Sequence, residues 1–125
     1  MTDRELLELA AKAAGIVGTY QHWEDSRGCV SRGIAPDGSS GRDWWNPLTD
    51  DGDALRLAVK LGISTLPYPV YNHDERHSVM AKQRRRSDTL REKNPTEVIE
   101  LYGDDPYSAT RRAIVRAAAE IGGKR

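Results

Sequence analysis

Cysteine and long hydrophobic runs are scarce in this sequence, and each scarcity narrows the class of protein. A single cysteine, Cys29, excludes an internal disulfide and suits a reducing cytoplasm. No apolar run approaches the roughly 18 residues that a membrane-spanning helix requires. The first residues show no basic region followed by an apolar core, so we expect no signal peptide. These absences predict a cytoplasmic protein without membrane contact.

An excess of charge of one sign is also lacking. The formal net charge is zero, so bulk charge does not indicate a nucleic-acid partner. The charges are nevertheless unevenly placed. Residues 1–75 hold 7 basic and 12 acidic side chains, and residues 76–125 hold 12 and 7, which gives the halves formal charges of −5 and +5. Such a split either marks a basic surface or makes the two halves attract each other.

The length and the grouping of apolar residues predict one folded domain over residues 1–125. A chain of 125 residues is long enough to bury roughly two-thirds of its unfolded surface in one core. Hydrophobic residues make up 38% of the chain and charged residues 30%. The apolar residues occur in periodic runs, which argues against disorder.

Local capping signals predict a helix near each end of the chain. Thr2 and Glu5 have the spacing of a capping box, and the apolar residues after them repeat at helical spacing, which predicts a helix over 3–14. Asp105-Pro106 combines an N-cap residue with a proline at the first helical position, which predicts a helix over 106–121. The residues expected to share one apolar face of this second helix are Tyr107, Ile114, Ala118 and Ile121.

The stretch from Trp44 to Gly62 predicts the central element of the fold. Two adjacent tryptophans precede a proline-containing turn and a cluster of aspartates suited to the N-terminus of a helix. We predict a helix over 51–61, with Gly62 as a left-handed C-cap. Its expected apolar face consists of Ala54, Leu55, Ala58, Val59 and Leu61.

The remaining apolar segments predict strands. A hairpin is expected between Gly18 and Ile34, with its turn at Asp25-Ser26-Arg27-Gly28. The segment 63–71 contains two prolines, so it should be an edge strand or an extended cover segment. Further strands are expected at 78–82 and 96–102. The predicted fold class is α+β in the order α-β-β-α-β-β-β-α, with one antiparallel sheet of four or five strands flanked by three helices.

Two groups of residues have side chains that can bind a metal ion, but neither group predicts a metal site. His73 and His77 would share a face of a helix, but in extended chain they lie roughly 13 Å apart at about 3.3 Å per residue. Asp50, Asp51 and Asp53 could offer oxygen ligands to a hard cation, but capping of the following helix explains them without an ion. We therefore expect no metal and no cofactor.

Catalytic residues are equally hard to assemble. Cys29 and His22 could form a nucleophile and a base, but a lone cysteine on an apolar strand is more often a small core residue. No oxyanion-hole motif and no glycine-rich nucleotide fingerprint follows a predicted strand. We predict that the protein is not an enzyme.

A basic run over residues 82–93 is the strongest functional signal. Arginine side chains bind phosphate with two parallel hydrogen bonds, so this run could contact nucleic acid, a nucleotide or an acidic protein surface. Tyr68, Tyr71 and Trp23 could add stacking faces. The alternative is a solvated loop, since Asp88 and Glu92 dilute the charge. The candidate binding residues are Arg84, Arg85, Arg86 and Arg91.

Two blocks of the sequence carry a resemblance to a known family. They are Trp45-Asn46-Pro47-Leu48-x-Asp50-Asp51-Gly52-Asp53-Ala54-x-Arg56-Leu57-Ala58-Val59-Lys60-Leu61 and Asp105-Pro106-x-x-Ala109-x-Arg111-Arg112-Ala113-Ile114-Val115. Both blocks resemble the phage ABA sandwich domain family of small bacteriophage and prophage proteins. The resemblance implies an α+β domain with a sheet flanked by helices, found in the cytoplasm of a bacterial host, and it supplies no catalytic residues.

The expected function is that of a non-enzymatic phage or prophage accessory protein that binds a host or phage macromolecule, most simply a protein. One alternative is a nucleic-acid-binding protein that uses the 82–93 loop. Another is an inhibitor of host defence that binds a protein or sequesters a nucleotide. Apolar residues around Tyr68, Val70 and Tyr71 either form a homodimer edge or cover the core.

Overall fold

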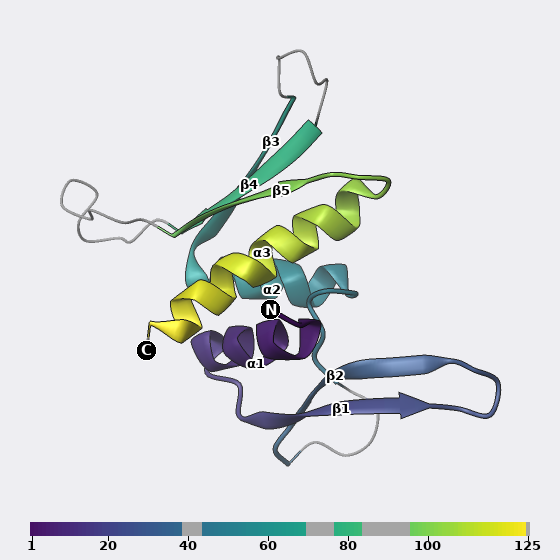
Figure 1. Cartoon of the computed structure of the whole chain (residues 1–125). Helices are drawn as coiled ribbons and strands as arrows, with labels where there is room; N and C mark the ends of the chain where they lie inside the picture. The colour runs from purple at the N-terminus through teal and green to yellow at the C-terminus, as the bar shows by residue number, and fades with distance from the viewer. Residues whose placement is uncertain (39–43, 70–76, 84–95, 125) are drawn as a thin grey trace.

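A computed structural model describes residues 1–38, 44–69, 77–83 and 96–124 (Figure 1). It confirms the α+β class and the predicted order of elements. The elements found in these residues are α1 (Asp3–Ala14), β1 (Gly18–Glu24), β2 (Val30–Pro36), α2 (Asp51–Leu61), β3 (Ile63–Pro69), β4 (His77–Gln83), β5 (Glu97–Leu101) and α3 (Pro106–Gly123). None of the described helices is long and apolar enough to cross a membrane.

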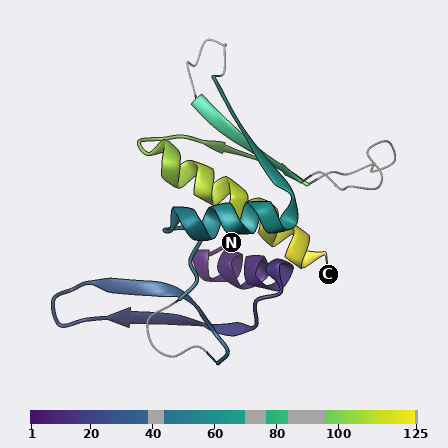
Figure 2. The same cartoon turned by 180° about the vertical axis from the view of Figure 1, so that it is seen from behind.

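The strands form two antiparallel sheets, so the prediction of one sheet with four or five strands is wrong. β1 pairs only with β2 among the named strands, whereas β3, β4 and β5 form a second sheet in that order. The helices lie between the two sheets (Figures 1 and 2). α3 packs on the three-stranded sheet and α1 packs on the hairpin. The helix layer therefore keeps the strand edges apart, although the strands and the hairpin between β1 and β2 were predicted from local sequence.

All three predicted helices are confirmed, and local signals set their ends. The Thr2 hydroxyl accepts the Glu5 N–H at 3.2 Å, and the Glu5 carboxylate accepts the Thr2 N–H at 2.9 Å, which completes the capping box of α1. Asp50 caps α2 by accepting the Asp53 N–H at 2.8 Å, and Gly62 ends that helix with a φ of 67°. Asp105 caps α3 in the same way.

α1 and α3 approach each other closely because small residues lie between them. A Cβ atom added to Gly122 would lie 2.0 Å from the Leu9 carbonyl oxygen, so only glycine fits at this crossing. The shared core cluster is rich in alanine from both helices, and it also takes in apolar residues of α2 and the three-stranded sheet. The alanines of this cluster on α1 and α3 are Ala10, Ala13, Ala14, Ala113, Ala117, Ala118 and Ala119.

The apolar face predicted for α2 is partly wrong. Leu55 and Val59 are 65% and 74% exposed, whereas Leu57, which was not assigned to that face, is buried. α2 packs against α3 and β3. Its buried residues, Ala54, Leu57, Ala58 and Leu61, follow the i, i+3, i+4, i+7 spacing of a single stripe.

The face predicted for α3 needs one correction of the same kind. Ile114, Ala118 and Ile121 are buried as predicted. Tyr107 is 73% exposed because it lies in the first turn of α3, before the first buried residue of the helix, Ala109.

Candidate functional site

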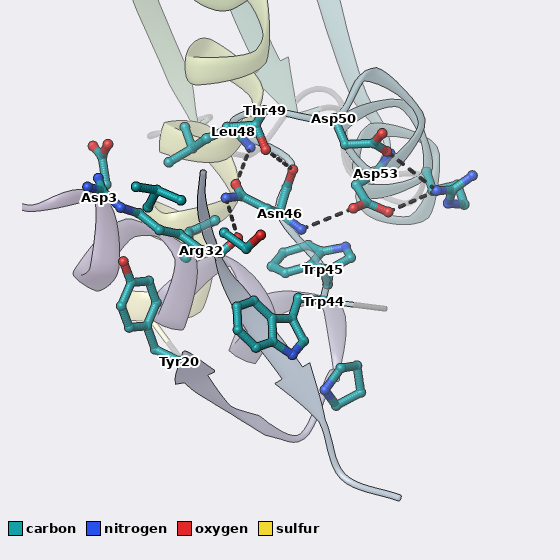
Figure 3. A pocket seen from close by; sticks show the side chains of 15 residues that line it. Asp3, Tyr20, Arg32, Trp44, Trp45, Asn46, Leu48, Thr49, Asp50 and Asp53 are labelled. Carbon is teal, nitrogen blue, oxygen red and sulfur yellow. Dashed lines mark hydrogen bonds and ion pairs between the residues drawn. The ribbon is translucent and has the colours of Figure 1, made fainter. Parts of the chain in front are cut away.

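An open groove of about 890 Å³ lies between the β1–β2 hairpin and the N-terminal end of α2 (Figure 3). Its walls come from four parts of the chain: the start of α1, the hairpin, residues 44–50 and the first turns of α2. Figure 3 shows Asp3 and Tyr20 on one side of the groove and Asp50 and Asp53 on the other. The groove therefore forms only when the hairpin is held against the helices.

Asn46 holds the hairpin against α2. Its backbone N–H donates to the Asp53 carboxylate at 3.0 Å, and its side-chain amide donates to the Arg32 carbonyl of β2 at 2.9 Å. Its side-chain oxygen accepts the Leu48 N–H at 3.0 Å. Asn46 is 7% exposed, so these bonds are largely shielded from water. One buried side chain thus fixes both the strand and the turn that leads into the helix.

A short backbone bridge joins β2 to the tryptophan pair. The Ile34 N–H donates to the Trp45 carbonyl and the Trp45 N–H donates to the Ile34 carbonyl, both at 2.8 Å. Gly33 makes this approach possible, since a Cβ there would lie 2.7 Å from the Trp45 carbonyl oxygen. Trp45 also packs against the hydrophobic core. The tryptophan wall is therefore anchored rather than loosely attached.

Three aromatic side chains line the groove: Tyr20, Trp44 and Trp45. The Arg4 guanidinium lies 5.4 Å from the centre of the Tyr20 ring and so contributes a cation–π contact that holds the ring. The hydrogen-bonded Glu8 carboxylate raises the pKa of Arg4, so this cation stays charged. The aromatic walls can accept an apolar or aromatic group of a ligand.

Some charged side chains of the groove form ion pairs with described residues and one does not. Arg56 pairs with Asp53 at 2.8 Å and lies 3.8 Å from the Asp50 carboxylate. Asp3 pairs with Arg112 at 3.0 Å. Arg32 is exposed, lines the groove and forms no ion pair with another described residue. An anionic group of a ligand would meet this arginine first.

The candidate binding residues predicted from sequence, Arg84, Arg85, Arg86 and Arg91, lie outside the described residues. Val70, Tyr71 and His73 also lie outside them. Lys82, at the start of the basic run, is part of β4 and partly buried. Trp23 lies on β1 and is 50% exposed, but it does not line the groove.

Cys29 is exposed in the hairpin turn, so the prediction that it is a core residue is wrong. Its N–H donates to the Asp25 carboxylate at 2.9 Å, which fixes the turn at the projecting end of the hairpin. His22 pairs with Arg32, whereas Cys29 faces Asp25, three residues further along the chain and just past the end of β1. At about 3.3 Å per residue this places the two backbones roughly 10 Å apart. The structure does not bring them together as a nucleophile and a base.

The three aspartates considered as cation ligands instead form hydrogen bonds and ion pairs at the N-terminal end of α2. Asp50 is the N-cap, Asp53 binds the Asn46 N–H and Arg56, and Asp51 pairs with Arg111 at 2.7 Å. Within the part of the chain that the structure describes, no group of three histidine, cysteine or acidic side chains could hold a metal ion.

Sequence reasoning missed the groove itself. The stretch from Trp44 to Asp53 was identified as central, but as a packing element only. The missing information is the contact between Asn46 and Arg32, which are 14 residues apart in the chain. Comparison of the chain with protein-family models, with curated proteins and with solved structures found no match.

Proposed function

We propose that this chain is a non-enzymatic accessory protein that binds a protein partner through the groove. The observation that carries the proposal is an open groove lined both by aromatic side chains and by an arginine without an ion pair to any described residue. Tryptophan, tyrosine and arginine are the side chains that most often dominate the binding energy of protein interfaces. The anchored Trp45 and Tyr20 present these surfaces with little freedom left to lose on binding.

The charge of the groove favours a protein over a nucleic acid. Asp3, Asp50 and Asp53 contribute three negative charges, against two positive charges from Arg32 and Arg56. Nucleic-acid affinity depends on an excess of positive groups that neutralise phosphates. A mixed, slightly acidic groove therefore suits a polypeptide surface better.

The resemblance of residues 45–61 and 105–115 to the phage ABA sandwich family supports a phage or prophage setting. We accordingly place the partner among host or phage proteins. Inhibition of a host defence protein is one role that such binding would serve.

Affinity capture from phage-infected host lysate tests this proposal. Wild-type protein should retain a protein partner after nuclease treatment. A groove variant, Trp44→Ala with Arg32→Ala, should retain at least about 10-fold less, because loss of interface tryptophan and arginine typically costs 2 kcal/mol or more. The matched control is Trp23→Ala with Arg27→Ala, which removes the same residue types at positions of the β1–β2 hairpin that do not line the groove.

A third variant separates the basic loop from the groove. Arg84→Ala, Arg85→Ala, Arg86→Ala should retain the partner. Captured nucleic acid that disappears in this triple variant would replace the proposal with nucleic-acid binding by the 82–93 loop. Equal capture by the groove variant and the wild type would also overturn it.

A further inference from the structure

The outer edge of β2 is only partly paired. The N–H and C=O groups of Ile34 both bond Trp45, so they point away from β1. In an antiparallel ladder this direction alternates, so Arg32 and Val30 also direct their backbone groups away from β1. The bond from the Asn46 side chain to the Arg32 carbonyl confirms the alternation. The N–H of Arg32 and both backbone groups of Val30 therefore face outward from the hairpin.

Among the residues that the structure describes, the chain does not continue along this edge. Trp45 forms a single bridge to β2, and the following residues turn toward α2. Pro47 lacks an N–H and favours this departure. Beyond the bridge, the edge of β2 faces the groove, and no third strand from the described residues pairs with it. The residues at this part of the edge are Val30, Ser31 and Arg32. The groove thus occupies the position where an added strand would lie (Figure 3).

We propose that the groove binds an extended peptide segment of the partner, which pairs with the Val30–Arg32 edge as a third strand. This inference rests on the proposed function and specifies its ligand. Strand addition to an exposed sheet edge draws its affinity from backbone hydrogen bonds and its specificity from pockets for alternate side chains. The bridge to Trp45 shows that this edge already accepts an antiparallel neighbour.

The side chains around the edge define the sequence that the peptide should carry. The Cβ position of Gly33 faces Trp44 at 3.2 Å from its Cβ, and Arg32 points to the opposite face because side chains alternate along a strand. An acidic side chain of the peptide would pair with the Arg32 guanidinium on that face. Trp44 calls for an apolar or aromatic side chain on the other face. Acidic and apolar residues should therefore alternate in the peptide.

Selection from a displayed library of random peptides against the full chain tests this inference. Enriched peptides should show the acidic–apolar alternation. Synthetic copies methylated at one backbone nitrogen at a time should lose at least about 10-fold in affinity at a single position, the one whose N–H bonds the Val30 carbonyl, because the Arg32 and Ile34 carbonyls of this edge already accept from Asn46 and Trp45. Methylation tolerated at every position, or no enriched peptide at all, would overturn strand addition.

A pair of proline variants locates the edge. Val30→Pro removes an outward N–H from β2 and should weaken binding of the selected peptides at least about 10-fold. His22→Pro removes an outward N–H from the opposite edge of the same hairpin and should leave binding within about 2-fold, since the ladder between β1 and β2 uses neither N–H. Equal binding by Val30→Pro and wild type would contradict the assignment. Methylated peptides probe the unaltered protein, so the inference stays testable if a proline variant fails to fold.

The two proposals can fail separately. If the groove variant loses its captured partner while peptide methylation has no position-specific effect, the groove binds a folded surface and only strand addition is wrong. If the groove variant keeps its partner while the selected peptides bind at the β2 edge, the partner binds elsewhere and the proposed function is wrong.

Discussion

At the scale of single residues, Asn46 links β2, the turn before α2 and α2 itself through its hydrogen bonds. It satisfies the Arg32 carbonyl and the Leu48 N–H with one amide group. Its own backbone N–H is bound by Asp53, seven residues ahead. Removing the amide would leave partners on both the strand and the turn without a protein hydrogen bond.

We expect Asn46→Leu to lower the free energy of unfolding by about 1–3 kcal/mol, the usual cost of an unsatisfied buried polar group. Urea unfolding monitored by tryptophan fluorescence provides the measurement. Thr49→Val serves as control, because Thr49 is an exposed residue and its hydroxyl contact to the Asn46 carbonyl is long, at 3.5 Å. Equal stability of Asn46→Leu and Thr49→Val would contradict this role.

At the scale of elements, the crossing of α1 and α3 depends on the absence of a side chain at Gly122. The Leu9 carbonyl occupies the space that a Cβ would need. Gly123, the next residue of the same helix, has no neighbouring atom within 4 Å of its Cβ position. The same glycine-to-alanine substitution can therefore be made at two neighbouring positions of α3, one closely packed and one open.

We expect Gly122→Ala to destabilise the fold by about 1–3 kcal/mol or more, because the helices must move apart to admit the methyl group. Gly123→Ala should change the stability by less than about 1 kcal/mol. Thermal unfolding followed by circular dichroism compares them directly. A melting temperature for Gly122→Ala equal to that of Gly123→Ala would show that the crossing can relax.

The elements themselves were largely predictable because their signals are local. Thr2 and Glu5 lie three residues apart, and Asp105-Pro106 and Gly62 mark helix ends by their own conformational preferences. The faces of the helices were less predictable. Leu55 and Val59 form an apolar pair four residues apart, and only the packing partners show that this pair faces outward.

At the scale of the whole molecule, some of the excess charges of the two halves form ion pairs between them. Arg111 and Arg112 of α3 pair with Asp51 and Asp3 of the acidic half. Arg116 instead pairs with Glu100, within the basic half. Of the two interpretations of the charge split, attraction is confirmed for these pairs. The basic run over residues 84–93 lies outside the described residues, so the interpretation as a basic surface stays a prediction.

We expect Arg111→Met to cost more stability than Asp51→Asn. The Arg111 side chain is 17% exposed and also donates to the Leu48 carbonyl at 2.8 Å, a charge-assisted bond worth about 1.5–3 kcal/mol. The Asp51 side chain is 79% exposed, so the ion pair itself is worth at most about 1 kcal/mol. Unfolding in denaturant at low and high salt separates the two terms, since only the ion pair is screened. The reverse order of stabilities would refute this assignment.

The arrangement of the two sheets and the groove could not be derived from sequence because both depend on contacts distant in the chain. The β1–β2 hairpin is set by its own turn, but nothing local prevents β2 from pairing with β3. The helix layer decides this, through the Gly122 crossing and the packing of α3 on β4 and β5. The groove depends on the bridge between Ile34 and Trp45 in the same way.

The alanine-rich junction of α1 and α3 also has an entropic consequence. A buried alanine has no rotamers to lose, whereas a buried leucine loses about 0.5–1 kcal/mol of side-chain freedom and a methionine up to about 2 kcal/mol. The alanines of this junction are therefore ordered at almost no side-chain entropy cost, and the Leu9 backbone lies directly against Gly122. A change in the spacing of the two helices must displace whole backbone segments, so this junction acts as the stiff frame on which the hairpin is mounted.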